Sequence, residues 1–455
     1  MKSRRTIVFT ASVLAIVMML TNISVYAQQA SKTQQTDLAL FSNSAKATSD
    51  NPGARPEGES SVALKYLVEQ ALERNPEIKA MARSFDAMRE RIPQAKALPE
   101  PMLEYGYVGN INPVPPFDIQ KGDPSSARML SFSQELPFPG KLALKSQMAA
   151  REAESEWWNY EQTRLNVIAE VKDAYFDLFY LTKALETVTK NKDLLGKFAK
   201  IAEARYSVGK GIQQDVLKAQ VEISKLIEQS TMLEQRRDTA IARINSLLYR
   251  NPEFPLGNPE EIKPQSLSQT LTELNQLALA NYPTLKMQRR KIDREQLGVR
   301  LAEKEFYPDF NVKFTYQNRP QLPEMYGVSV GVTIPLYLWQ KQRPAVAEAA
   351  ASKAAEQKRL ENLTTLLFFK LKDKYLAATT AQKLVSLYGT TIIPQSSLSL
   401  ESAIASYEVG KVDFLTLLDN IVTLLNYELS YYEQLSNVEK AVASMEPLVG
   451  VGLRP

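Results

Sequence analysis

Residues 141–206 read KLALKSQMAAREAESEWWNYEQTRLNVIAEVKDAYFDLFYLTKALETVTKNKDLLGKFAKIAEARY, a run with no proline and one glycine, Gly196. At about 1.5 Å per residue, one helix over this run would be roughly 100 Å long, beyond the diameter of a globular domain. Apolar residues recur along it every three or four positions: Val171, Ala174, Leu178, Leu181, Leu185, Val188, Leu195, Ala199 and Ala202. The same spacing returns over 216–247 and 414–442. Such sustained heptads predict long helices that pack as coiled coils, in a chain that is mainly α with a small β part.

Three short stretches recur in the same order, roughly 200 residues apart, which indicates an internal duplication. ALERNPEIK at 71–79 returns as ALANYPTLK at 278–286, and YSVGK at 206–210 returns as YEVGK at 407–411. Leu136-Pro137 has its counterpart in Ile334-Pro335. The glycines of the YxVGK stretches are typical of helix ends, so each unit should contain a long antiparallel hairpin. We predict a first repeat over 61–255 with its tip at 206–211, a second over 256–447 with its tip at 407–412, and a tail over 448–455.

Two pairs of alternating segments predict four strands per chain, over 102–110, 128–136, 309–318 and 325–336. In the third segment, Phe310, Val312, Phe314 and Tyr316 alternate with polar residues. Runs of about ten residues suit tilted membrane-spanning strands, apolar toward lipid and polar toward a lumen. An amphipathic hairpin on a soluble core would show the same alternation, and four strands cannot close a barrel alone.

Composition excludes most enzyme and metal-site classes. The 455 residues include no cysteine, no histidine and only 17 glycines. Disulfides, thiolate sites, histidine general bases and the commonest zinc ligand are therefore absent. Acidic residues are not concentrated in a cleft-forming context, so a carboxylate-based glycosidase is disfavoured. We predict that the chain is not an enzyme, that it has no catalytic, cofactor-binding or metal-binding residues, and that it uses no cofactor.

The first 27 residues have the pattern of an export signal. Lys2, Arg4 and Arg5 precede an apolar run, and Ala27 ends a small-x-small cleavage pattern. A membrane anchor is the alternative, although the apolar run is short for a span. Removing the three positive charges of this segment lowers the net charge from +4 to +1, so no nucleic-acid partner is indicated. Residues 28–60 are polar and predict a flexible leader, either disordered or wrapped around the assembly.

Duplicated hairpins, two strand pairs and the lack of His and Cys together resemble the TolC-like outer membrane efflux protein family over residues ~60 to ~445. The repeated Asn- and Pro-containing stretch, ELPFPGK at 135–141, and DVLKAQ at 215–220 after the first tip are similar to its motifs. The Pro-Gly-Lys of 139–141 is most similar to the heavy-metal efflux branch.

The resemblance implies a homotrimer with a 12-stranded transmembrane β-barrel and a periplasmic α-helical tunnel. It implies an outer membrane location with contacts to membrane lipid. The channel would conduct passively in a tripartite system, with a periplasmic adaptor (membrane fusion protein) and an inner-membrane pump of the RND type. The residues implied for adaptor docking are those of the two tips: Val208, Gly209, Lys210, Val409, Gly410 and Lys411.

The resemblance also implies a periplasmic gate. In the family, a Tyr at the second tip contacts an Asp of the first hairpin, positions that Tyr407 and Asp215 occupy here. Asp419 matches one of two acidic positions that ring the closed constriction, whereas Thr416 replaces the other. Val412 stands where a closing Arg would be. A solvated surface charge explains Asp419 equally well, and stabilisation of a helix N-terminus explains Asp215 equally well.

A periplasmic coiled-coil scaffold without a channel is the alternative function. It leaves unexplained why both repeats carry alternating strands with uncharged apolar faces. The sequence leaves three points open: whether the transported substrate is a metal ion or a drug, which pump and adaptor are the partners, and whether the resting pore is open or closed.

Overall fold

The computed structural model describes residues 61–109, 126–319 and 322–454. The predicted export signal, 1–27, and the whole of the predicted leader, 28–60, lie outside these residues. The elements of the first half are β1 (Ser61–Val62), α2 (Leu64–Arg74), α3 (Pro76–Lys96), β2 (Met102–Val108), β3 (Ala127–Leu136), α4 (Lys141–Ser207) and α5 (Gln213–Leu247). Those of the second half are β4 (Asn258–Pro259), α6 (Leu271–Asn281), α7 (Pro283–Lys304), β5 (Asp309–Asn318), β6 (Met325–Thr333), η1 (Leu338–Gln342), α8 (Arg343–Leu387), η2 (Tyr388–Ile392), α9 (Ile393–Glu408) and α10 (Phe414–Val449).

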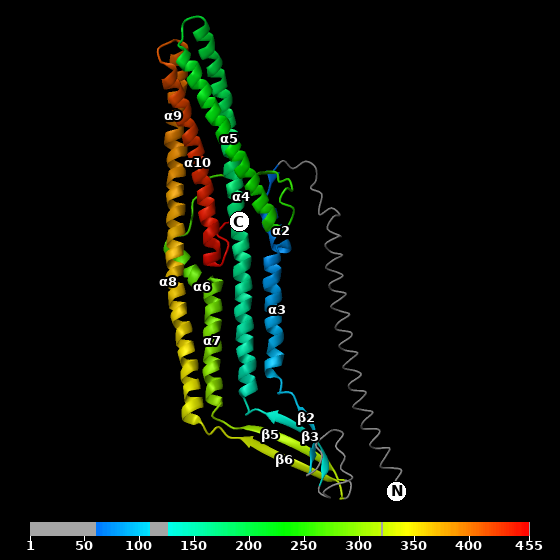
Figure 1. The fold of residues 1–455 in the computed structure, drawn as a ribbon. Helices are drawn as coiled ribbons and strands as arrows, with labels where there is room; N and C mark the ends of the chain where they lie inside the picture. Colours follow the sequence, from blue (N-terminus) through cyan, green and yellow to red (C-terminus); the bar gives the residue numbers. More distant parts are fainter. Residues whose placement is uncertain (1–60, 110–125, 320–321, 455) are drawn as a thin grey trace. The chain divides into compact units, whose positions relative to one another are not determined.

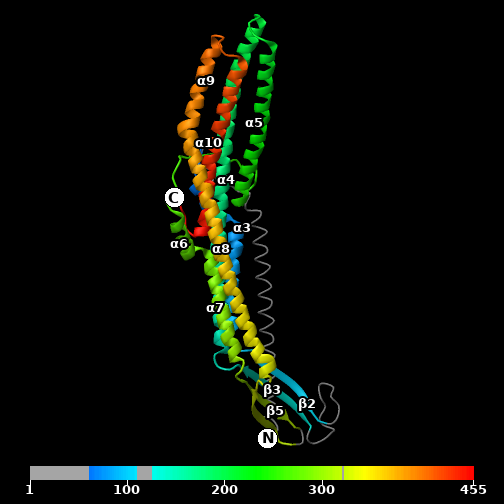
Figure 2. The same cartoon turned by 90° about the vertical axis from the view of Figure 1, so that its left-hand side faces the viewer.

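The prediction of a mainly helical chain with long hairpins and a small β part is confirmed. Helices of both halves run side by side, with the four-stranded sheet at one end and the two glycine turns at the other (Figures 1 and 2). α4 packs against α3, α5, α7 and α10. Most of its predicted apolar positions are buried, among them Val171, Ala174 and Leu178.

Prolines lie at element boundaries in three parts of the chain. Two helices precede the strands of each repeat, because Pro76 and Pro283 begin new ones. The strand expected over 325–336 ends at Thr333, since Pro335 has no N–H for the ladder. The helix that follows it contains two π-helical turns, η1 and η2, and η2 lies directly before Pro394 in α9.

The main sheet has the strand order β2-β3-β5-β6, with every neighbour antiparallel. β3 of the first repeat therefore pairs with β5 of the second, for example Phe132 with Phe314. β2 and β6 are its edges. β1 and β4, which the sequence did not predict, form a separate parallel pair.

A buried lysine joins the sheet to the helices. Lys141 is 2% exposed, and its Nζ donates to both carboxylate oxygens of Asp309 at 2.9 Å and to Glu305 Oε2 at 3.1 Å. The backbone N–H of Phe138 donates to Asp309 Oδ1 at 2.7 Å. Gly140, with φ of +97°, turns the chain from β3 into α4. The Pro-Gly-Lys stretch thus connects the end of β3 to the start of β5, across the two repeats.

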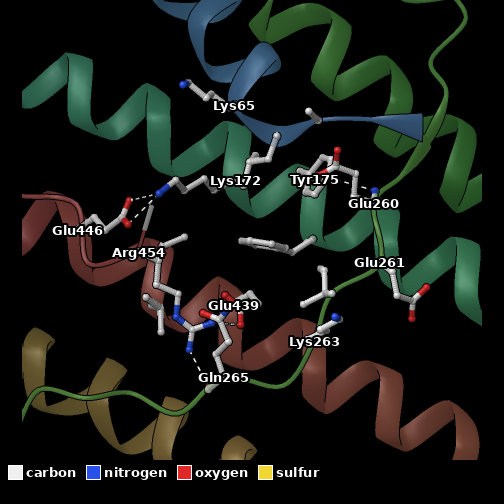
Figure 3. A pocket seen from close by; sticks show the side chains of 16 residues that line it. Lys65, Lys172, Tyr175, Glu260, Glu261, Lys263, Gln265, Glu439, Glu446 and Arg454 are labelled. Carbon is white, nitrogen blue, oxygen red and sulfur yellow. Dashed lines mark hydrogen bonds and ion pairs between the residues drawn. The ribbon is translucent and has the colours of Figure 1, made fainter. Parts of the chain in front are cut away.

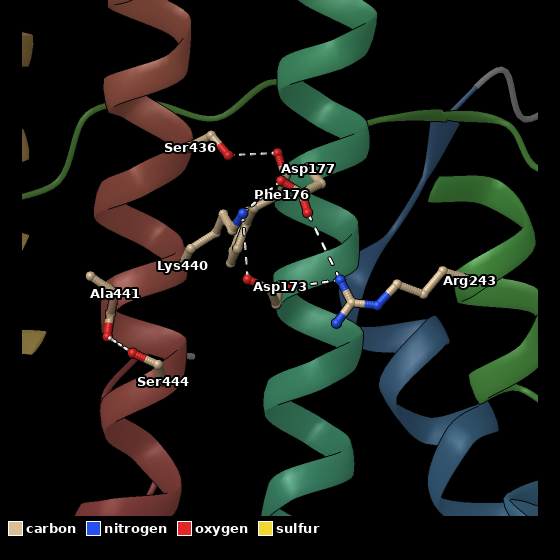
Figure 4. A network of polar contacts seen from close by, with 8 residues as sticks. All are labelled: Asp173, Phe176, Asp177, Arg243, Ser436, Lys440, Ala441 and Ser444. Atoms are coloured by element: carbon tan, nitrogen blue, oxygen red, sulfur yellow. Dashed lines mark hydrogen bonds and ion pairs between the residues drawn. The ribbon is translucent and has the colours of Figure 1, made fainter. Parts of the chain in front are cut away.

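Further ion pairs hold α4 in the middle of its length. Lys440 of α10 donates to Asp177 Oδ1 at 2.6 Å, and Arg243 of α5 donates to Asp173 Oδ2 at 3.0 Å (Figure 4). Because Asp173 and Asp177 lie one turn apart on α4, these contacts fix α5 and α10 to the same turn of the central helix.

The C-terminal tail folds back beside α10, next to a cavity of about 330 Å³ (Figure 3). Arg454 pairs with the buried Glu439, and Lys172 of α4 donates to Glu446 at 2.7 and 2.8 Å. Burial raises the pKa of the Glu439 carboxyl, against the lowering effect of Arg454. The tail therefore supplies the directly paired counter-charge of a buried acid.

Candidate functional site

The two predicted tips have the same backbone geometry. Gly209 and Gly410 have φ of +73° and +75°. Each glycine N–H donates to the carbonyl three residues earlier at 3.0 Å, and the N–H of the following Lys210 or Lys411 donates to the carbonyl five residues earlier at 2.9 Å. This is a Schellman ending. A Cβ at either glycine would meet no atom within 4 Å, so the requirement for glycine is conformational.

The tips present apolar and basic side chains to solvent. Val208 and Val409 are 66% and 69% exposed, and Lys210 and Lys411 are exposed beside them. The structure thus places all six predicted docking residues at one end of the helices, on two neighbouring turns. Their role in adaptor docking stays a prediction.

Tyr407 is buried between the two tips. It is 3% exposed, and its ring packs against Phe414 with centroids 5.9 Å apart. The guanidinium of Arg205, from the end of α4, lies 4.3 Å from the centre of the Tyr407 ring. Its Nη2 donates to the backbone oxygens of Tyr407 at 2.8 Å and Glu408 at 2.9 Å. The first hairpin therefore contacts the end of α9 through a cation.

Asp215 lies in the first turn of α5, and its side chain is half-buried. Burial and the nearby charge of Asp413 raise the pKa of its carboxyl. Burial also raises the pKa of the Tyr407 hydroxyl; Arg205 opposes this shift, and the charge of Asp215 adds to it. The structure thus brings Tyr407 and Asp215 within electrostatic range, while the hydrogen bonds from the first hairpin to Tyr407 come from Arg205.

The other two predicted gate residues, Thr416 and Asp419, lie one turn apart on α10 and are both exposed. The N–H of Thr416 donates to Asp413 Oδ1 at 2.9 Å, so Asp413 is the N-cap of α10. Hydrogen bonds from Thr416 lower the pKa of the Asp413 carboxyl. Thr416 therefore belongs to a helix cap, whereas Asp419 presents its carboxylate to solvent.

Sequence reasoning missed two residues of this site, Arg205 and Asp413. A cation in the last turn of a helix is a known C-terminal signal, and an Asp before an apolar helix start is a known N-cap signal. Both signals were present in the sequence. The C-terminal signal does not indicate that the hydrogen-bond acceptors of Arg205 belong to Tyr407 and Glu408, which lie 202 and 203 residues further along the chain.

The four-stranded sheet has one apolar and one polar face. Residues paired directly across strands share a face. Two neighbouring rows of the apolar face are Tyr105, Leu130, Tyr316, Tyr326 and Leu103, Phe132, Phe314, Val328. Two rows of the polar face are Glu104, Ser131, Thr315, Gly327 and Met102, Ser133, Lys313, Ser329. Lys313 Nζ contacts Glu104 Oε2 at 3.0 Å on the polar face, across β3. Among the described residues, side chains of the apolar face are exposed, with Tyr326 64% and Val328 73% exposed.

Within the described ranges, no helix has both the length and the apolar character needed to cross a membrane. The same residues contain no group of three or more His, Cys, Asp or Glu side chains that could hold a metal ion.

Comparison with known proteins relates this architecture to one family. The family described as "Outer membrane efflux protein" matches residues 67–248 and 274–451. The cobalt-zinc-cadmium resistance protein CzcC of Cupriavidus metallidurans is 24% identical over 401 residues, covering 86% of this chain and 90% of that protein. The outer membrane protein TolC of Vibrio cholerae is 27% identical over 175 residues, 38% of each chain.

Solved structures show the same fold at low identity. CusC superposes with a TM-score of 0.74 at 15% identity, covering 89% of this chain and 96% of that one. The MtrE outer membrane channel of Neisseria gonorrhoeae, in its open state, gives 0.71 at 16% identity, covering 89% and 95%. The resemblance inferred from the sequence motifs is thereby confirmed, and with it the prediction that the chain is not an enzyme. The chain belongs to the outer membrane efflux protein family, and it is a TolC-like member of it.

Proposed function

We propose that three copies of the chain form an outer membrane duct, closing their sheets into a 12-stranded barrel and continuing as a helical tunnel into the periplasm. The two-faced sheet is the observation that carries this proposal. Its edges, β2 and β6, pair on one side only among the described strands. Backbone groups of an open edge cannot remain unpaired in lipid, so further copies are needed to complete the sheet. Each of three copies would contribute four strands.

The apolar rows would face membrane lipid, and the polar rows would face the lumen. Val328, Val330 and Val332 of β6 are 73%, 66% and 49% exposed, as expected of side chains that meet lipid in the assembly. Tyr337 and Trp339, just beyond β6, are each 70% exposed and suit the membrane–water interface. An export signal over residues 1–27 would bring the chain to this location.

The tips would dock a periplasmic adaptor, and an inner-membrane pump of the RND type would supply the energy. Exposed valines and lysines on two neighbouring turns offer an apolar contact with a basic rim, a combination that suits a protein partner. Tyr407 and Asp215 would hold the tips together at the periplasmic end. Asp419 would contribute one carboxylate per chain to a ring at the constriction, with Thr416 supplying no second charge. Such a ring favours cations in a narrow pore.

The cargo we propose is divalent transition-metal ions. This proposal rests on the similarity to CzcC over most of both chains, together with the Pro-Gly-Lys stretch of 139–141. The ion would be cargo delivered by the pump, not a resident ligand of the duct.

The membrane assembly is tested by the same substitution on the two faces of one strand. Val330→Asp places a carboxylate on the apolar face, and the control Ser329→Asp places it on the polar face, opposite Lys313. We expect Ser329→Asp to yield heat-modifiable trimers in the outer membrane fraction and Val330→Asp to lose most of them, because charge on the lipid face opposes insertion. Equal behaviour of the two variants, with the wild type in the soluble periplasmic fraction, would support the scaffold alternative.

The cargo is tested by growth of a strain lacking this gene on graded copper, zinc, cobalt and nickel, beside dyes, detergents and antibiotics. Sensitivity to metals alone, restored by the wild-type gene, supports the metal proposal. Sensitivity confined to organic compounds would contradict it and would make the chain a multidrug duct.

A further inference from the structure

Arg205 stands at the last turn of α4, immediately before the first tip. Its single Nη2 atom donates to two backbone oxygens of the second hairpin, those of Tyr407 and Glu408, at 2.8 and 2.9 Å. The same guanidinium covers the Tyr407 ring, 4.3 Å from its centre. We define these three contacts as the tip contact.

The tip contact places a cation where the second hairpin is most able to accept one. Tyr407 and Glu408 are the last residues of α9. The final carbonyls of a helix lack partners within the helix and lie at the negative end of its dipole. A planar guanidinium can cap such carbonyls and stack on an aromatic ring at once, which a lysine ammonium cannot do. Arg205 of the first repeat therefore completes the C-terminal cap of a helix of the second repeat.

The duplication does not repeat this contact. The residue that corresponds to Arg205 in the second repeat is Ser406, which cannot supply a cation. Tyr206, the counterpart of Tyr407, is 47% exposed, against 3% for Tyr407. The tyrosine that contacts the arginine, Tyr407, is the buried one, and its counterpart without such a contact is exposed. Each chain therefore has one tip contact, directed from the first hairpin to the second.

We propose that Arg205 is a positioning residue that holds the second tip against the first and so sets how readily the tips separate. This role rests on the proposed function, in which the tips surround the periplasmic end of the duct. It is distinct from the Tyr407–Asp215 pair, because Arg205 acts on the backbone and ring of Tyr407 and on the carbonyl of Glu408.

The experiment compares full-length wild type, Arg205→Ala, Arg205→Gln and the control Lys200→Ala in planar lipid bilayers. Lys200 is an exposed cation on the same helix and forms no ion pair with any residue that the structure describes. Arg205→Gln keeps most of the aliphatic part of the side chain and removes the charge. If Arg205→Ala assembles poorly, Arg205→Gln can still be compared with wild type. Heat-modifiable trimers of each protein are quantified first.

We expect the ratio of open to closed channels to rise on the order of ten-fold in Arg205→Ala, the size of effect expected for hydrogen bonds to a charged group. Arg205→Gln should fall between Arg205→Ala and wild type, and Lys200→Ala should match wild type. Equal ratios in all four trimeric proteins would overturn the role of Arg205 and leave the proposed duct standing. Failure of the wild type to form outer membrane trimers would instead refute the proposed function, and the role of Arg205 with it.

Discussion

Replacing Lys141 by Met should weaken the junction between sheet and helices more than any exposed charge change nearby. Methionine has a similar length and volume, so packing of the stem is largely retained while the ammonium is lost. Asp309 then loses two contacts of 2.9 Å, and Glu305 loses one of 3.1 Å. The N–H of Phe138 remains as a donor to Asp309.

The magnitude follows from the exposure of the three groups. Breaking a fully buried ion pair costs about 3–5 kcal/mol, because the remaining charge stays without a partner. Here the lysine side chain is 3% exposed, but those of Asp309 and Glu305 are 25% and 46% exposed and can recover water. We therefore expect a loss near the lower limit, about 2–3 kcal/mol per chain.

The assay is the apparent melting temperature of purified trimers at one fixed scan rate, with Lys145→Met as the matched control one turn along α4. Lys145 is exposed and forms no ion pair with the residues described. Since 1 kcal/mol lowers the melting temperature of a mid-sized domain by about 2–4 °C, the expected loss of about 2–3 kcal/mol corresponds to a decrease of about 4–12 °C for Lys141→Met. A decrease no larger than that of Lys145→Met would refute the reasoning.

The pH dependence of the same contact has a defined sign. Burial lowers the pKa of Lys141, but the hydrogen bonds and charges of Asp309 and Glu305 outweigh it, so the pKa lies above the ordinary 10.5. A raised lysine pKa stabilises the fold below the unfolded-state value and loses this effect as the pH rises through the folded-state value. The difference between wild type and Lys141→Met should therefore persist at neutral pH and shrink in strongly alkaline buffer.

Three further changes have expected outcomes. Gly450→Ala should destabilise the fold more than alanine at Gly209 or Gly410, because its Cβ would lie 2.5 Å from the backbone oxygen of Asn281. At the two tip glycines, the left-handed φ alone costs about 1 kcal/mol of stability. Melting temperatures of the three variants test this order. Asp215→Asn keeps a polar side chain beside Tyr407 and removes only the negative charge, so it should retain the contact and stabilise the tips at neutral pH, since burial and the charge of Asp413 raise the pKa of the Asp215 carboxyl. Wild-type stability should accordingly rise as the pH falls through that pKa, and a parallel pH profile of the variant would contradict this assignment. Arg454→Gln should destabilise the fold by about 3 kcal/mol, because it leaves a buried carboxylate of α10 without its cation; urea titration should show a smaller loss at lower pH, where that acid is protonated.

Sequence periodicity accounts for much of the architecture. Heptad spacing located α4, α5 and α10 to within a few residues, because the seam of a coiled coil repeats along one helix. Period-2 alternation located β3 and β5 in the same way. The glycines of the two tips were predictable because a positive φ is a local requirement. These are properties of neighbouring residues.

The candidate site could be predicted from the sequence only in part. The tip residues and the Tyr407–Asp215 pair were predicted from motif positions. Arg205 was not, since its partners are defined by how the two hairpins pack, not by its own surroundings in the chain. The helix breaks at Pro76 and Pro283 were visible as prolines, but whether a proline begins a new helix or kinks an existing one depends on what packs around it.

The sequence by itself determined the duplication, the extents of α4 and α5, the position of both tips and the two-faced character of each strand, because each depends on residues within a few turns of one another. Only the tertiary structure decided that β3 pairs with β5, that Lys141 meets Asp309 168 residues away, and that Arg205 caps a helix of the other repeat. Such contacts depend on how two long hairpins pack against each other, and that arrangement is determined by many weak apolar contacts acting together. No single local pattern encodes that sum.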